Sequence, residues 1–184
     1  ASGLEVLRSH GLENLGTVLN LTTAIADEPE VEHIADYVDL LQNRFWLDLL
    51  AGRPLEQQLF DNTKHITDWS FLDQDQLKKI AAPIDWLGIN YYTPFRVIAA
   101  QEQAKQAVGQ DFSLFPGTPS GAAMNPLEPR TEMGWEIHAP SMTTTLKATA
   151  ERLPGVPLYV TENGGAFDDK LVDGEVHDSG RVDY

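Results

Sequence analysis

Residues 157–165, PLYVTENGG, place one carboxylate at the end of an apolar run. Leu158, Tyr159 and Val160 are typical of a short buried strand, and the Asn-Gly-Gly that follows is a turn signal that ends it. Glu162 is therefore expected where a strand leaves a hydrophobic core. Parallel α/β folds present catalytic groups to a cleft from this position. Taken alone, the pattern leaves two interpretations open: a catalytic carboxylate, or a solvated acid at a strand end.

The length and composition are those of one globular domain. With 184 residues, 42% of them hydrophobic, the chain is long enough to bury a sizeable core. Thirteen basic residues stand against twenty-eight acidic ones, which gives a formal net charge of −15. Such a surplus of negative charge repels phosphates, so we expect neither nucleic acid nor an anionic membrane surface as a partner.

The sequence contains no cysteine, which excludes disulfides, thiolate metal sites and cysteine nucleophiles within these residues. The absence of cysteine suits the cytoplasm, which is the predicted location. No apolar run approaches the ~18 residues of a membrane-spanning helix, and no signal-peptide pattern opens the chain. Leu4, Val6 and Leu7 already belong to an apolar pattern, so we do not expect Ala1 to be the natural start.

Apolar spacing predicts where the helices lie. The first segment, up to Gly11, is typical of the end of a helix. In a long helix that we expect to stop near Gly52 and Pro54, apolar residues recur at spacings of three and four: Val31, Ile34, Val38, Leu41, Phe45 and Leu49. Further helices are predicted over 75–82 and 141–153.

Strands are predicted over 15–21 and 84–92, in addition to the strand that ends at Glu162. Strands separated by helical crossovers form parallel sheets, so the predicted fold class is α/β. Between them, the stretch 93–134 is rich in proline, glycine and polar residues, and we expect a long loop over one face of the domain.

Five segments together resemble glycoside hydrolase family 1, the β-glucosidase family. In chain order they are RFWLD at 44–48, IDWLGINYY at 84–92, MGWEI at 133–137, YVTENG at 159–164 and VDGEVHD at 172–178. The resemblance implies a (β/α)8 TIM barrel and retaining hydrolysis of β-glycosides.

In that frame the strands at 15–21, 84–91 and 158–162 would be the fifth, sixth and seventh of the barrel. The chain contains no Asn-Glu-Pro segment, which in the family ends the fourth strand and carries the general acid/base. The first four strands and the last are also missing. We therefore predict part of a TIM barrel: residues 1–184 form a single partial catalytic domain with its long loop at about 93–134. The expected partners are complementary barrel segments, from another chain or an unseen part of the same enzyme.

The resemblance also implies roles for four residues. Retaining glycosidases use two carboxyl groups about 5–5.5 Å apart, one as nucleophile and one as acid/base. Glu162 would be the nucleophile, and Tyr92 would donate a hydrogen bond to it. Asn90 would join this network or only cap its strand. Trp135 would stack on the aglycone of a small β-glycoside or oligosaccharide, or else anchor its loop.

No cofactor and no metal are expected. The acidic residues between 168 and 178 do not follow the spacing of a calcium loop. Asp173-Gly174, between Val172 and Val176, instead predicts a hairpin turn.

Two alternatives to hydrolysis stay open at this point. One is a non-catalytic carbohydrate-binding or structural fragment, which the missing acid/base carboxylate favours. The other is a transglycosidase, which passes the sugar to an acceptor other than water.

Overall fold

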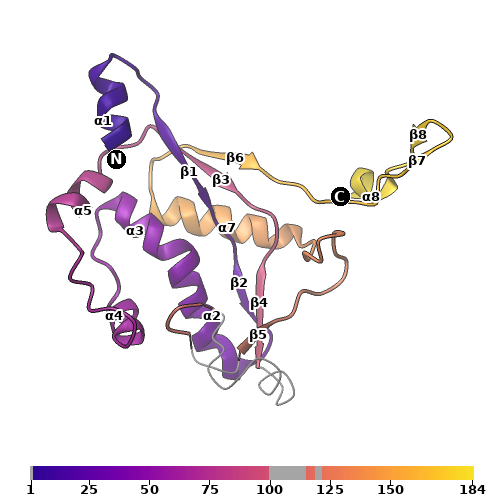
Figure 1. The fold of residues 1–184 in the computed structure, drawn as a ribbon, viewed down its shortest axis with the longest axis horizontal. Coiled ribbons are helices and arrows are strands. Elements are labelled where there is room, and N and C mark those ends of the chain that lie inside the picture. The colour runs from indigo at the N-terminus through magenta and orange to yellow at the C-terminus, as the bar shows by residue number, and fades with distance from the viewer. Residues whose placement is uncertain (1, 100–114, 119–121) are drawn as a thin grey trace.

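Helices and strands alternate along the chain in the computed structural model, which describes residues 2–99, 115–118 and 122–184 (Figure 1). In chain order its elements are α1 (Ser2–Ser9), β1 (Gly16–Asn20), β2 (Ala24–Ala26), the 3-10 turn η1 (Pro29–Val31), α2 (Glu32–Asp39), the π-helical segment η2 (Leu40–Arg44), α3 (Phe45–Ala51), α4 (Gln57–Thr63), α5 (Gln74–Ile80), β3 (Trp86–Asn90), β4 (Phe95–Ala99), β5 (Ala122–Met124), α7 (Ala139–Arg152), β6 (Leu158–Glu162), β7 (Leu171–Val172), β8 (Glu175–Val176) and α8 (Ser179–Asp183).

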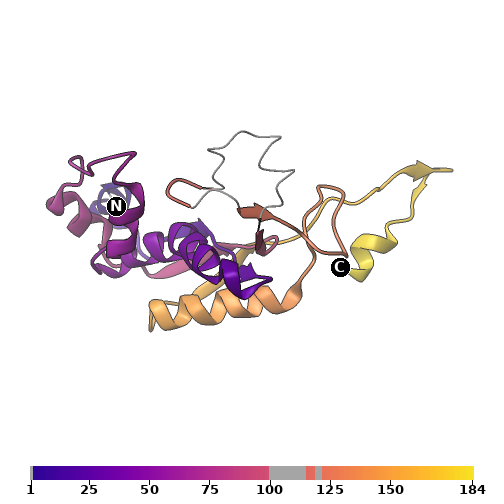
Figure 2. The same ribbon diagram turned by 90° about the horizontal axis from the view of Figure 1, so that it is seen from below.

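A parallel sheet in the order β1-β3-β6 contains the three strands that the sequence predicts. Figure 1 shows α3 and α7 beside these strands, and the C-terminal hairpin extended away from them. Figure 2 shows α7 along one side of the molecule. The prediction of an α/β fold with parallel strands is confirmed. Because three parallel strands have two free edges, the sheet does not close into a barrel.

One face of this sheet is covered by the helices. Leu87 and Ile89 of β3 are fully buried and pack with Leu47 of α3 and with Leu153, at the end of α7. Burying such a side chain stabilises the fold by about 1.5–3 kcal/mol. Alternate residues of β3 thus form the core, while those between them face the other way.

The other face, which we call the open face, carries side chains in layers. Trp86 and Tyr159 meet edge to face, with ring centroids 6.0 Å apart. One step along, a β-carbon on Gly88 would come within 2.8 Å of methyl groups of both Val18 and Thr161. A glycine is needed there because the neighbouring strands already fill the layer. Side chains stacked in this way fill the interior of TIM barrels.

The prediction that β6 is a buried strand is wrong. Tyr159 is 57% and Val160 44% exposed. Strand β6 lies at the edge of the sheet and pairs only with β3 among the described strands, so its apolar side chains lack the neighbours that burial requires.

The predicted long helix exists, but it is not one uniform helix. Gly52 ends it as expected, in the left-handed conformation at φ 67°. Between α2 and α3, however, the five residues of η2 form a π-helix. A π-helical turn changes which residues face the sheet, and apolar spacing at three and four residues does not predict it.

A small second sheet, in the order β2-β4-β5, lies beyond the carboxyl ends of β1 and β3. The loop expected at 93–134 thus contains two strands; its residues 100–114 and 119–121 lie outside the described part. The predicted hairpin is confirmed as β7 and β8, with Asp173 and Gly174 at φ 51° and 84°. No helix in the described ranges is long and apolar enough to cross a membrane.

Candidate active site

All four site residues named from the sequence lie together at the carboxyl ends of β3 and β6. The phenol of Tyr92 donates a hydrogen bond to Oε2 of Glu162. The indole of Trp135 lies beside Tyr92, with ring centroids 5.4 Å apart and the planes tilted by 56°. The amide oxygen of Asn90 accepts a hydrogen bond from Thr161 at 2.7 Å, so this side chain contacts β6 next to Glu162 rather than Glu162 itself.

A β-bulge determines where Glu162 points. Ile89 pairs with Val160, but Asn90 pairs with Glu162, so Thr161 is one extra residue on β6. Without the bulge, strict alternation would turn Glu162 to the same face as Val160, toward the helices. The extra residue lets both Thr161 and Glu162 reach partners on the open face. Bulges beside active sites commonly redirect one side chain in this way.

Asn163, which the sequence predicted only as part of the turn after the strand, holds the two strand ends together. Its amide nitrogen donates to the carbonyl oxygen of Tyr91 at 2.8 Å. The Tyr91 N–H in turn donates to the carbonyl oxygen of Glu162 at 3.0 Å. These bonds join Tyr91, the residue before Tyr92, to Glu162 and Asn163. They restrain the position of one strand end relative to the other.

Trp135 is held by the residue that follows it. Glu136 is 3% exposed and accepts two hydrogen bonds from the guanidinium of Arg96 on β4, at 2.9 and 2.6 Å, and one from the N–H of Leu127 at 3.0 Å. Arg96 lowers the pKa of Glu136 below its usual value, against the opposing effect of burial. Neither residue stood out in the sequence, since ion pairs between residues 40 positions apart have no local signature.

A cavity of about 250 Å³ opens beside these groups. Its wall is formed by Asn20, Leu21, Thr22, Gln42, Asn90, Tyr92, Thr93, Phe95 and Trp135. Glu162 is not part of the wall but is joined to it through Tyr92. The wall thus combines three aromatic side chains with several amide and hydroxyl groups, and a carboxylate lies next to it. Such a cavity can bind a ligand that has both polar hydroxyl groups and an apolar face.

The hydrogen bond between Tyr92 and Glu162 has a measurable consequence. It raises the pKa of Tyr92 above its ordinary value, with reduced hydration and the Glu162 charge acting in the same direction. Replacing Glu162 with glutamine removes that charge, so we expect the pKa of Tyr92 to fall toward the ordinary value. An ultraviolet difference titration, with Tyr92→Phe to identify the signal, measures this. An unchanged phenol titration would contradict the contact.

Among the described residues, no group of three or more histidine, aspartate or glutamate side chains could hold a metal ion.

The fold and this site define a class of protein: part of an α/β barrel with a carboxylate at the end of one strand and its hydrogen-bond donor on the next. The sequence profile of glycosyl hydrolase family 1 matches residues 2–184. The chain belongs to glycosyl hydrolase family 1.

Relatives and solved structures agree with this assignment. The chain is 37% identical over 176 residues to a bifunctional β-D-glucosidase/β-D-fucosidase of Bifidobacterium breve, covering 92% of this chain and 37% of that enzyme. It is 35% identical over 180 residues to the thermostable β-glucosidase B of Thermobispora bispora, covering 97% and 35%. The structure of a psychrophilic β-glucosidase from Micrococcus antarcticus superimposes with a TM-score of 0.82 at 30% identity, covering 98% of this chain and 41% of that one. The chain thus spans about two fifths of the length of these relatives.

Proposed function

We propose that the chain is the nucleophile-bearing part of a retaining β-glycosidase, a single partial catalytic domain that acts on small β-glycosides or oligosaccharides. Glu162 attacks the anomeric carbon and forms a covalent glycosyl-enzyme, which water then hydrolyses. The observation that carries the proposal is the hydrogen bond from Tyr92 to Glu162 at the carboxyl ends of two neighbouring parallel strands.

The other residues have supporting roles in this proposal. Tyr92 keeps one oxygen of the carboxylate fixed and leaves the other free to attack. Trp135 offers an apolar face to the aglycone, next to Tyr92. Asn90 orients the bulge through Thr161. The second carboxylate, which protonates the leaving oxygen, comes from a barrel segment outside the 184 residues.

The open face supports that need for further segments. Val18 and Tyr159 are exposed on it, and β1 and β6 each leave one edge unpaired within the described sheet. Additional barrel strands would cover both edges and side chains, as in a closed barrel. Catalysis must therefore be measured in a protein that also contains the other barrel strands. A suitable protein is a chimaera in which the 184 residues replace the matching segment of the Bifidobacterium breve enzyme, referred to below as the chimaera.

Covalent labelling tests the proposal. A 2-deoxy-2-fluoro-β-glucoside with a good leaving group is expected to label the chimaera at Glu162. The fluorine slows both the formation and the hydrolysis of the glycosyl-enzyme, whereas the good leaving group speeds up its formation only, so the covalent intermediate accumulates. Peptide mass spectrometry locates the label. Glu162→Gln should abolish labelling, whereas Glu132→Gln, at an exposed acid beyond the site, should leave it intact.

A folded, monomeric chimaera that takes up no label would instead favour a non-catalytic carbohydrate-binding or structural fragment. Transglycosylation is a separate outcome: with methanol added, a transglycosidase forms the methyl glycoside as its main product, and a hydrolase forms the free sugar.

A further inference from the structure

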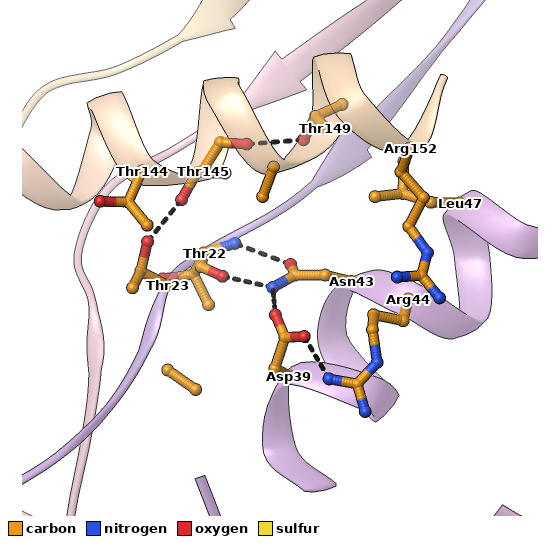
Figure 3. Close-up of a pocket in the computed structure, with 12 residues that line it drawn as sticks. Thr22, Thr23, Asp39, Asn43, Arg44, Leu47, Thr144, Thr145, Thr149 and Arg152 are labelled. Carbon is orange, nitrogen blue, oxygen red and sulfur yellow. Dashed lines mark hydrogen bonds and ion pairs between the residues drawn. The ribbon is translucent and has the colours of Figure 1, made fainter. Parts of the chain in front are cut away.

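Asn43, in the π-helical segment η2, holds the loop that follows β1 (Figure 3). Its side-chain oxygen accepts a hydrogen bond from the N–H of Thr22 at 3.0 Å, and its nitrogen donates to the carbonyl oxygen of the same residue. Asn43 is 8% exposed and Thr22 is buried, so water competes little for these groups. One side chain thus binds both backbone polar groups of Thr22.

Asp39 determines which way the Asn43 amide faces. Oδ1 of Asp39 accepts a hydrogen bond from the amide nitrogen at 2.6 Å, and its Oδ2 accepts one from Arg44 at 2.6 Å. A carboxylate paired with arginine can only accept hydrogen bonds. The amide nitrogen must therefore point toward Asp39, which leaves the oxygen for the N–H of Thr22.

The π-helical geometry of η2 makes these contacts possible. The N–H of Phe45 bonds to the carbonyl oxygen of Leu40, five residues back, instead of four. The wider turn lets Asn43 face the end of β1 while the adjacent Arg44 reaches Asp36 on the preceding helix. Such turns are frequent at functional sites.

Thr22 links this clamp to the candidate active site. Its hydroxyl donates to the carbonyl oxygen of Thr93, and the hydroxyl of Thr93 donates to the carbonyl oxygen of Glu136 at 3.0 Å. Tyr92 and Trp135 are the residues immediately before Thr93 and Glu136. Each link ends on backbone, so a shift of Thr22 moves the backbone that carries both aromatic side chains.

We propose that Asn43 is a positioning residue for the reaction: through Thr22 and Thr93 it keeps Tyr92 and Trp135 in register with Glu162. This inference rests on the proposed function. It assigns Asn43 no contact with substrate.

The first test replaces Asn43 with alanine in the chimaera. Misplacing catalytic groups by about 1 Å can cost up to about 100-fold in rate, so we expect kcat to fall between about 10- and 100-fold. KM for an aryl β-glucoside should rise by no more than about threefold, because Arg96 still holds Glu136 and with it the backbone next to Trp135. The pKa of Tyr92 should move toward its ordinary value in the same variant, since its hydrogen bond to Glu162 loosens. The control is Asn62→Ala, which removes the same kind of side-chain amide from helix α4. It should leave kcat, KM and the pKa of Tyr92 unchanged.

A second variant separates positioning from folding. Thr22→Val removes the hydroxyl that reaches Thr93 but keeps the branched shape, and it should reproduce the loss in kcat. The double variant N43A/T22V should lose no more than the worse single variant, because both changes interrupt one path. Additive losses, or a lower melting temperature with unchanged kcat and phenol titration, would overturn the proposal.

The phenol titration requires no turnover. A chimaera that is inactive with Asn43 intact would therefore contradict the proposed function alone, while the response of Tyr92 to Asn43→Ala would still decide the positioning role.

Discussion

Glu162→Ala in the chimaera is expected to lower kcat by about 10⁴-fold or more, as removal of a covalent nucleophile does in other enzymes. The substitution removes the atom that attacks the anomeric carbon and leaves Tyr92 without its acceptor. Steady-state rates on an aryl β-glucoside, with the protein's fold checked by circular dichroism, measure the effect.

Chemical rescue shows that this loss is specific. The space vacated in Glu162→Ala admits a small anion, so added azide should restore turnover of an activated substrate and give an α-glycosyl azide by direct displacement. Glu132→Ala is the matched control and should keep its rate without azide. A Glu162→Ala variant with more than about a tenth of the original kcat would contradict the nucleophile assignment.

Arg96→Met is expected to destabilise the chimaera by about 3–5 kcal/mol, because it leaves the buried carboxylate of Glu136 without its arginine partner. The side chains of Arg96 and Glu136 are 10% and 3% exposed. Equilibrium unfolding in urea gives the difference in the free energy of unfolding. The control is Arg130→Met: Arg130 pairs with Glu128 at 3.2 Å, but the two side chains are 37% and 77% exposed, and the expected loss is about 0–1 kcal/mol.

The effect of Arg96→Met should depend on pH in one direction. Arg96 lowers the pKa of Glu136 in the folded protein. The pair therefore contributes its full stability above the unfolded pKa of about 4.3 and loses it as the pH falls through the folded value. The difference in the free energy of unfolding between Arg96→Met and the unsubstituted chimaera should become smaller as the pH falls from 7 to 3. A constant difference across that range would mean that Glu136 is not the group that Arg96 stabilises.

Trp135 should respond to the same substitution. Glu136 fixes the backbone beside the indole, so Arg96→Met should raise KM for aryl glycosides as well as lower stability, if Trp135 contacts the aglycone as proposed. Arg130→Met should leave KM unchanged.

Much of the architecture follows from local pattern. Apolar spacing located β1, β3, α5 and α7 to within a few residues, and Asp173-Gly174 marked the hairpin, because helix and turn preferences depend on neighbours in the chain. The three predicted strands are the three of the parallel sheet. The family resemblance brought Glu162, Tyr92, Asn90 and Trp135 to one place, and the structure finds them there, although their roles stay predictions.

Other features depend on contacts between residues far apart in the chain. The exposure of β6 follows from its place at the sheet edge. The π-helical turn at η2 brings Asn43 to Thr22, 21 positions away, and apolar spacing does not predict it. The pair of Arg96 with Glu136 joins positions 40 apart. No pattern within a short window encodes such contacts, so sequence reasoning missed them.

By itself the sequence determined that a carboxylate ends a strand at residue 162, with Asn-Gly-Gly after it. Only the tertiary structure decided where that carboxylate points. The extra residue at Thr161 turns Glu162 away from the helices and toward Tyr92. The physical reason is that a bulge is a property of the pairing between β3 and β6, so the residues of β6 alone do not show where the extra residue lies.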